Sequence, residues 1–172
     1  MRPESKFPPR ELKLLSREGI PAALERAQRY RLLNEPGEAE SICLDVLCVD
    51  AGNREAIVVL ILALTDQFAE HAGYVNRARE MLVQLKDEYQ QAYYKGIICE
   101  RQARAYLNRN SPGSRHLAYR YFDEAMELYE QAEQLRQPGN DEALLRRNSC
   151  ARAIDADRLE PEPVDDFRPL LE

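Results

Sequence analysis

The longest uninterrupted apolar stretch of the chain runs from Ala56 to Leu64, with polar residues on both sides. It is far shorter than the roughly 20 residues that a membrane-spanning helix needs. A buried strand would fit the length, but Asn53 is a good helix N-cap and Glu55 suits the first turn of a helix. The pattern therefore predicts a helix. Because this helix is apolar on nearly every side, we expect other elements to cover it on several sides.

The apolar spacing in residues 20–53 predicts two antiparallel helices joined by the turn "NEPGEA". The segment resembles a tetratricopeptide repeat (TPR), a helical hairpin of about 34 residues. Ala27 stands at the small position where the two helices touch, Tyr30 at the aromatic position three residues later, and Ala39 at the small position that opens the second helix. The resemblance implies that this segment is one repeat of a helical stack.

Two further hairpins follow in phase with the first. Arg54 begins the second, whose helices are separated by an insertion around "FAEHAGYVN", where His71 is expected in a surface loop. The third is expected to span Glu88–Leu107 and Arg115–Leu135, with Gly96 as the small residue between its helices. The resemblance thus extends to about residue 153.

These patterns predict an all-α fold, a TPR-like solenoid of about three repeats with a capping helix at each end. Residues 1–19 are expected to contain a short capping helix over residues 9–19, residues 20–153 to form the repeat domain, and residues 154–172 to be an acidic, proline-containing tail that stays unpacked. In the closing helix, residues 141–154, Arg146, Arg147 and Arg152 are expected to meet water.

The net charge of the chain limits the classes of binding partner that are expected. The chain has 24 Lys and Arg residues against 30 Asp and Glu residues, a formal net charge of -6, which disfavours nucleic acid and anionic membranes. The N-terminal stretch "MRPESKFPPRELK" has no apolar segment of the secretory kind, so a cytoplasmic location is expected. A protein or peptide partner is the remaining expectation.

Catalytic, metal-binding and cofactor-binding motifs are not found. The four cysteines show no CxxC spacing, and the chain has no phosphate-binding glycine motif and no nucleophile elbow. Cys43 and Cys48, which lie next to aliphatic residues in a predicted helix, are expected to be unreactive core residues. We therefore expect no metal, no cofactor and no enzymatic activity.

The resemblance also implies where a partner would bind, because the first helix of each TPR lines a concave groove. The matching positions here are mostly aliphatic or aromatic, unlike the Lys, Arg and Asn residues of repeats that grip acidic C-terminal peptides. They favour a segment with apolar anchors. The competing interpretation is that several of them are simply core residues. The expected groove residues are Leu24, Gln28, Val58, Val59, Leu62, Tyr93, Tyr94 and Ile97.

The sequence thus predicts a non-catalytic adaptor or scaffold that binds a partner segment in an apolar groove. The alternative is a small client-specific chaperone, because size, acidity and three repeats are similar to those of the chaperones of secretion translocators.

The end of the chain, "DDFRPLLE", places three apolar residues beside Asp165 and Asp166. One interpretation is that this motif is a terminal segment without a binding role. The other is that it is a ligand that docks in the groove of its own chain or of a second copy, with its carboxylates near Lys95, Arg101 or Arg104. In the second case the tail inhibits the groove or joins two copies.

Overall fold

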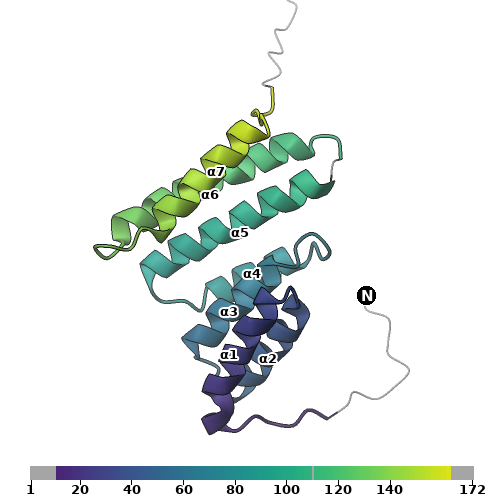
Figure 1. The fold of residues 1–172 in the computed structure, drawn as a ribbon, viewed down its shortest axis with the longest axis vertical. Helices are drawn as coiled ribbons and strands as arrows, with labels where there is room; N and C mark the ends of the chain where they lie inside the picture. The colour runs from purple at the N-terminus through teal and green to yellow at the C-terminus, as the bar shows by residue number, and fades with distance from the viewer. Residues whose placement is uncertain (1–10, 110, 164–172) are drawn as a thin grey trace, which may run out of the picture.

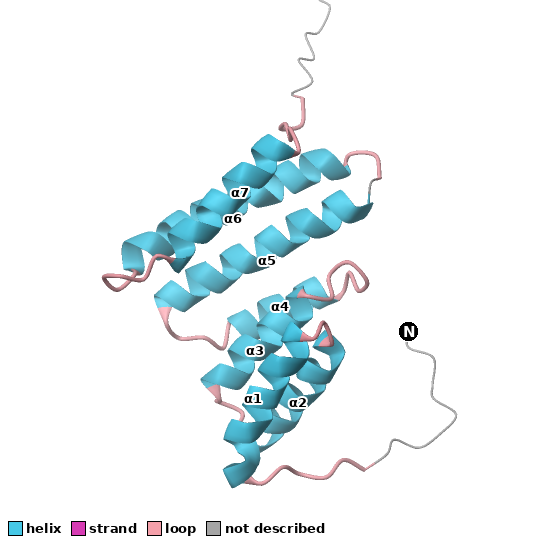
Figure 2. Ribbon diagram, viewed as in Figure 1, coloured by secondary structure: helices cyan, strands magenta, loops and turns pink. Residues whose placement is uncertain are grey.

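The computed structural model describes residues 11–109 and 111–163, and these are helical throughout apart from short connections (Figures 1 and 2). The prediction of an all-α fold is confirmed, since no strand occurs in these ranges. Nor is any helix in them long and apolar enough to cross a membrane. The elements in chain order are η1 (Arg17–Gly19), α1 (Ile20–Leu32), α2 (Pro36–Val49), α3 (Arg54–Thr65), α4 (Tyr74–Leu82), α5 (Glu88–Arg109), α6 (Ser114–Leu135) and α7 (Glu142–Ala156).

Consecutive helices pack against each other along the whole series, with the most extensive contact between α5 and α6. Helices α1 and α3 also touch, as do α3 and α5. In Figure 1 the helices α1 to α4 form one end of the molecule, and α5, α6 and α7 lie across the other end. One face therefore carries α1, α3 and α5 side by side, and we call it the odd-helix face.

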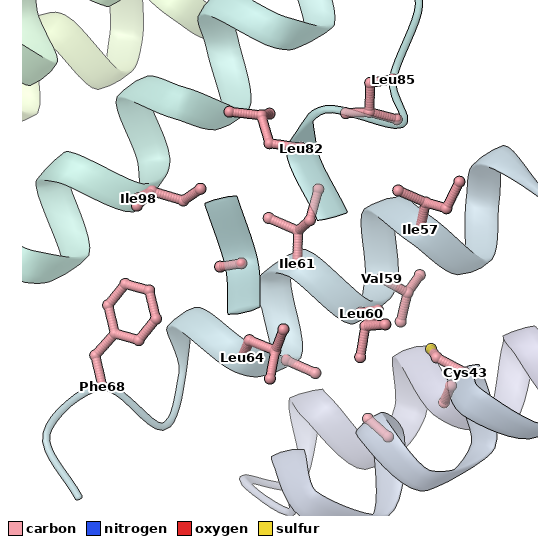
Figure 3. Close-up of a cluster of buried hydrophobic side chains, with 14 of the residues drawn as sticks. Cys43, Ile57, Val59, Leu60, Ile61, Leu64, Phe68, Leu82, Leu85 and Ile98 are labelled. Carbon is pink, nitrogen blue, oxygen red and sulfur yellow. The ribbon is translucent and has the colours of Figure 1, made fainter. Parts of the chain in front are cut away.

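Helix α3 is the apolar stretch of the sequence, and it is covered on several sides as predicted. The side chain of Asn53 accepts a hydrogen bond from the amide of Ala56 at 2.9 Å and caps the helix. Around α3 the core includes Cys43 from α2, Leu82 from α4 and Ile98 from α5 (Figure 3). Since α1 also contacts α3, the apolar residues of this helix are covered by four neighbouring helices.

Helices α5 and α6 approach closely because α5 has a glycine where they cross. A Cβ atom on Gly96 would lie 2.6 Å from Cε1 of Tyr129, which is fully buried. Such a distance is well inside van der Waals contact. The expectation that Gly96 is the small contact residue is confirmed.

The expected N-terminal capping helix is wrong for the residues described. Residues 11–16 are not helical, and only the single turn η1 precedes α1. Leu12 and Leu14 are 78% and 79% exposed, so a helix here would have no apolar face to bury. Ser16 instead caps η1 by accepting a hydrogen bond from the amide of Gly19 at 3.2 Å.

Two other expectations need correction. Cys48 is exposed, contrary to the expectation, whereas Cys43 is buried as predicted; Cys99 and Cys150 are buried as well. The segment after α7 is packed rather than loose as far as Leu159: this residue is buried, and the guanidinium of Arg115 donates to the carbonyl oxygens of Asp157 and Arg158, whereas residues 160–163 are exposed. The motif of residues 165–172 lies outside the described residues.

Candidate functional site

Polar side chains join the helices of the odd-helix face. Gln28 of α1 donates to Glu55 of α3 at 2.9 Å, and Arg54 of α3 donates to Gln90 of α5 at 2.6 Å. These contacts fix the lateral register of the three helices near the N-terminal ends of α3 and α5 and in the second half of α1.

At the other end of α3, one carboxylate joins all three helices. Asp66 receives a hydrogen bond from Arg31 of α1 at 2.9 Å, and Arg101 of α5 lies 3.7 Å from its second oxygen. The Nε atom of Arg101 is buried and has no hydrogen-bond partner among the described residues. The face is therefore bracketed by polar bridges at both ends.

Four of the eight predicted groove residues are not available on this face. Their side chains are between 1% and 8% exposed and belong to the core, so a partner cannot contact them in this structure. For these four the groove expectation is corrected, and the core interpretation holds. The reason is that each helix of the stack contacts two neighbours, and positions facing the gap between them become buried. These residues are Leu24, Val59, Tyr93 and Ile97.

The other four predicted residues reach solvent. Gln28 is exposed, and Val58, Leu62 and Tyr94 are partly buried. Val58 and Leu62 follow Arg54 at helical spacing on α3 and precede Asp66, while Tyr94 lies between Gln90 and Arg101 on α5. The three apolar side chains therefore lie along α3 and α5 between the residues of the two polar bridges, and we call this group the odd-face patch: Val58, Leu62 and Tyr94.

Each residue of the odd-face patch packs on one side against buried core residues. Val58 packs against the core around α3, Leu62 against the core around α6, and Tyr94 against both. Burial, and the neighbouring Tyr93, raise the pKa of Tyr94 to about 12. Its phenol is therefore a neutral hydroxyl at physiological pH, able to donate and accept a hydrogen bond at the edge of an apolar surface.

A buried polar cluster ties α5, α6 and α7 together and was missed from the sequence. Tyr129 donates to Glu100 at 2.8 Å, and Arg146 donates to Glu100 at 3.0 Å and to the hydroxyl of Tyr93 at 3.1 Å. Arg104 donates to the other oxygen of Glu100 at 3.1 Å. Arg146 was expected to meet water, but its guanidinium holds α7 on α5. Residues 100 and 146 are far apart in sequence, so no local pattern signals the pair.

The electrostatics of this cluster fix its charge state. Burial alone raises the pKa of Glu100, but the Tyr129 hydroxyl and the guanidiniums of Arg146 and Arg104 outweigh burial and lower it below the ordinary value. Burial and the same carboxylate raise the pKa of Tyr129. The cluster therefore consists of an ionised carboxylate, a neutral phenol and two cations, each satisfied by the others, which makes it a structural tie.

A cleft of about 440 Å³ lies among the end of α4, the start of α5 and the end of α6, and it too was missed from the sequence. Its apolar lining includes the buried Leu82 and Leu128 and the exposed Val83 and Leu135, which are 79% and 46% exposed. Lys95 also lines it. Val83 was expected inside the second helix of this hairpin, over residues 77–85, but α4 ends at Leu82 and leaves Val83 exposed beside the cleft.

Two observations in the described ranges concern metal ligands and thiols. These contain no group of three or more His, Cys, Asp or Glu residues placed to hold a metal ion. Burial raises the pKa of three thiols to about 12, so they are protonated at physiological pH; they belong to Cys43, Cys99 and Cys150. His71 lies in the exposed loop between α3 and α4, as expected.

Comparisons with known proteins identify no relative: no family model, curated protein or solved structure matches the chain.

Proposed function

We propose that this protein is a non-catalytic interaction module, an adaptor or scaffold, that binds a short segment of a partner protein on the odd-helix face. The proposal includes a TPR-like architecture of three hairpins, α1 with α2, α3 with α4 and α5 with α6, closed by α7. Its support is the order of the helices together with the small residues Ala27, Gly96 and Ala125, which are buried where helices meet.

The observation that carries the proposal is the odd-face patch. Its three apolar side chains are partly exposed on adjacent helices, yet they are fixed by the core beneath and by a polar bridge at each end. Rigid apolar anchors of this kind lose little conformational entropy when a partner covers them. The patch therefore suits one or two apolar side chains of a bound segment.

Charge beside the patch favours an acidic residue next to those apolar anchors. Arg101 and Arg104 lie three residues apart on α5, with side chains 35% and 43% exposed. Each has one acidic neighbour, Asp66 for Arg101 and Glu100 for Arg104, but these carboxylates are shared with Arg31 and Arg146, so the two guanidiniums are only partly neutralised. The expected occupant is thus a segment of a partner protein that carries apolar anchors followed by a carboxylate.

Variants of the patch test the proposal with the fold preserved. Lysine at Val58 or Leu62 keeps an aliphatic stem against the core while its ammonium reaches water, so the fold should survive. We expect Val58→Lys combined with Leu62→Lys to reduce affinity for the native partner at least tenfold. The matched control is Val83→Lys, which changes an exposed apolar residue of the other cleft and should leave affinity unchanged. If the double variant keeps its circular dichroism spectrum and binds as well as the wild type, the proposal is wrong.

Co-expression with the captured partner separates the adaptor from the chaperone alternative. A chaperone should keep a partner soluble that aggregates when it is produced alone, whereas an adaptor should bind a partner that is already folded and soluble. Solubility of the partner with and without this protein, measured in the same host, decides between them.

A further inference from the structure

A basic and aromatic surface lies at the tip of the α5–α6 hairpin, away from the odd-face patch in sequence and chemistry. Residues 101–122 contain five of the 24 basic residues of the chain, and none of its 30 acidic residues. The stretch includes the last turns of α5, the connection and the first turns of α6. In a chain with a net charge of -6, this concentration of positive charge sets the tip apart.

Four side chains of the tip form a continuous ladder across the two helices. The rings of Tyr106 and Tyr121 are stacked, with centroids 5.5 Å apart and planes 6° from parallel. The guanidinium of Arg109 lies 5.3 Å from the Tyr106 ring, and that of Arg120 lies 5.1 Å from the Tyr121 ring. Both arginines are exposed, and neither forms an ion pair with a described residue. We call these four residues the tip ladder.

The ladder leads into a cleft of about 190 Å³ that Tyr106 and Arg109 share with Arg79 of α4 and with Phe68. This cleft combines an apolar wall with one cationic group beyond those of the ladder, the guanidinium of Arg79. A segment that pairs carboxylates with an aromatic or aliphatic side chain is complementary to the ladder and the cleft together.

The chain itself delivers such a segment to this surface. After α7 the backbone crosses the tip: His116 hydrogen-bonds through Nδ1 to the carbonyl oxygen of Glu160 at 3.0 Å. Pro161 and Glu162 then line a cleft together with Arg120, a member of the ladder. The next residues, 164–172, contain Asp165, Asp166 and Phe167.

The length of the C-terminal segment and the charge of the nearby arginines favour the tip ladder over the surfaces around Lys95, Arg101 and Arg104. Nine extended residues span at most about 30 Å, whereas neighbouring groups of the ladder are only 5.1 to 5.5 Å apart. Lys95 lies about 21 Å along α5 from Arg109, given the rise of a helix. Arg101 and Arg104 each already have one carboxylate partner, Asp66 and Glu100. Arg109 and Arg120 have none among the described residues, and Arg120 lines the same cleft as Glu162, next to the end of the described chain.

We propose that residues 164–172 bind back onto the tip of their own chain. In this arrangement Asp165 and Asp166 pair with Arg120 and Arg109, and Phe167 packs against the Tyr121 and Tyr106 rings. The short connection holds the segment at an effective concentration in the millimolar range, so weak contacts suffice to keep it bound. This inference does not depend on the partner proposed for the odd-helix face.

Nuclear magnetic resonance of the full chain tests the proposal. The amide signals of the ladder residues are compared between the wild type and a variant with Asp165→Asn, Asp166→Asn and Phe167→Ser. We expect clear shifts at Tyr106, Arg109, Arg120 and Tyr121, and we expect added salt to move the wild-type signals towards those of the variant. The control is Leu170→Ser, which leaves the acidic residues and Phe167 in place and should change these signals much less.

A synthetic peptide of residues 164–172, added to the triple variant, should restore the wild-type positions of these signals with half-saturation in the millimolar range. A peptide with Asn at positions 165 and 166 should bind about fivefold more weakly or worse, because two exposed ion pairs are lost. Identical spectra of wild type and triple variant at the ladder would overturn the proposal. So would shifts at Leu62 and Tyr94 instead, which place the tail on the odd-helix face, or a wild-type mass that doubles with concentration in step with the shifts, which places it on a second copy.

Discussion

Gly96 offers the sharpest test of how the two longest helices are packed, because an added methyl group there has two opposing effects. Alanine is about 1 kcal/mol better than glycine in a helix interior. A Cβ atom at position 96, however, would lie 2.6 Å and 2.8 Å from Cε1 and Cδ1 of Tyr129. The ring is fully buried and has no room to swing away, so one of the two helices has to shift.

The cost can be worked from these contacts. Overpacking a core by one methyl group costs about 1–3 kcal/mol. Displacing the ring also strains the hydrogen bond from Tyr129 to Glu100, at 2.8 Å, and such a bond to a charged group contributes about 1.5–3 kcal/mol. After the helix-propensity gain of about 1 kcal/mol is subtracted, Gly96→Ala should destabilise the protein by about 1.5–5 kcal/mol. For a domain of this size the melting temperature should fall by roughly 3–20 °C.

Urea unfolding followed by circular dichroism measures this change, and a second glycine supplies the control. Gly37 lies in the first turn of α2, where the nearest atom to an added Cβ is Oε1 of Gln67 at 3.9 Å. Gly37→Ala should therefore be neutral or stabilising. In a Tyr129→Leu background, which removes the ring, Gly96→Ala should lose its penalty. If Gly96→Ala stabilises the wild type as Gly37→Ala does, the described α5–α6 contact is wrong.

Three further predictions concern the buried groups. Arg146→Met should lower the free energy of unfolding by about 2 kcal/mol, less than the loss of a fully buried pair because Arg104 still pairs with Glu100. The control, Arg152→Ala at an exposed position, should change the free energy of unfolding by less than about 0.5 kcal/mol. Equal effects of the two variants in urea unfolding would exclude a role for Arg146 in joining α7 to α5. The folded-state pKa of Glu100 lies below its ordinary value of 4.5, so this carboxylate stabilises the fold above that pH and the stabilisation is lost as the pH falls further. The difference in free energy of unfolding between Glu100→Gln and the wild type at pH 7 should therefore shrink by pH 3. A difference that stays constant with pH would contradict the lowered pKa. A thiol reagent should modify the exposed Cys48 rapidly in the native protein, whereas the three buried cysteines should react only in denaturant: Cys43, Cys99 and Cys150. Rapid labelling of more than one thiol per native chain would refute the burial of these three.

The helices could be predicted from the sequence because each carries a local signal. Asn53 caps α3, the apolar run of α3 requires cover on several sides, and Gly96 marks a close crossing; all three inferences hold in the structure. The short helix expected over residues 9–19 fails in the part that is described, because the exposed Leu12 and Leu14 show that no surface covers it. Periodicity shows that a segment has an apolar side, but not that another element covers that side.

The candidate site was less predictable for the same physical reason. Spacing placed Val59 and Ile97 on the first helices of their hairpins correctly, but whether such a residue faces solvent or the next helix depends on how closely the helices approach. The cluster around Glu100 joins residues from three helices, and the tip ladder joins two. Neither has a motif of its own, although the absence of acidic residues from residues 101–122 is visible in the sequence.

The central claim is that a partner segment covers the odd-face patch, and site-specific photocrosslinking tests it most directly. A photoreactive phenylalanine is introduced at Tyr94, where an aromatic side chain is already partly exposed, and separately at Val83 in the other cleft. After irradiation of each purified complex, mass spectrometry identifies the attached partner peptide. We predict a single adduct from position 94, with an acidic residue near the attached apolar one, and none from position 83. An adduct from position 83 alone would contradict the account, because it would place the partner outside the odd-helix face.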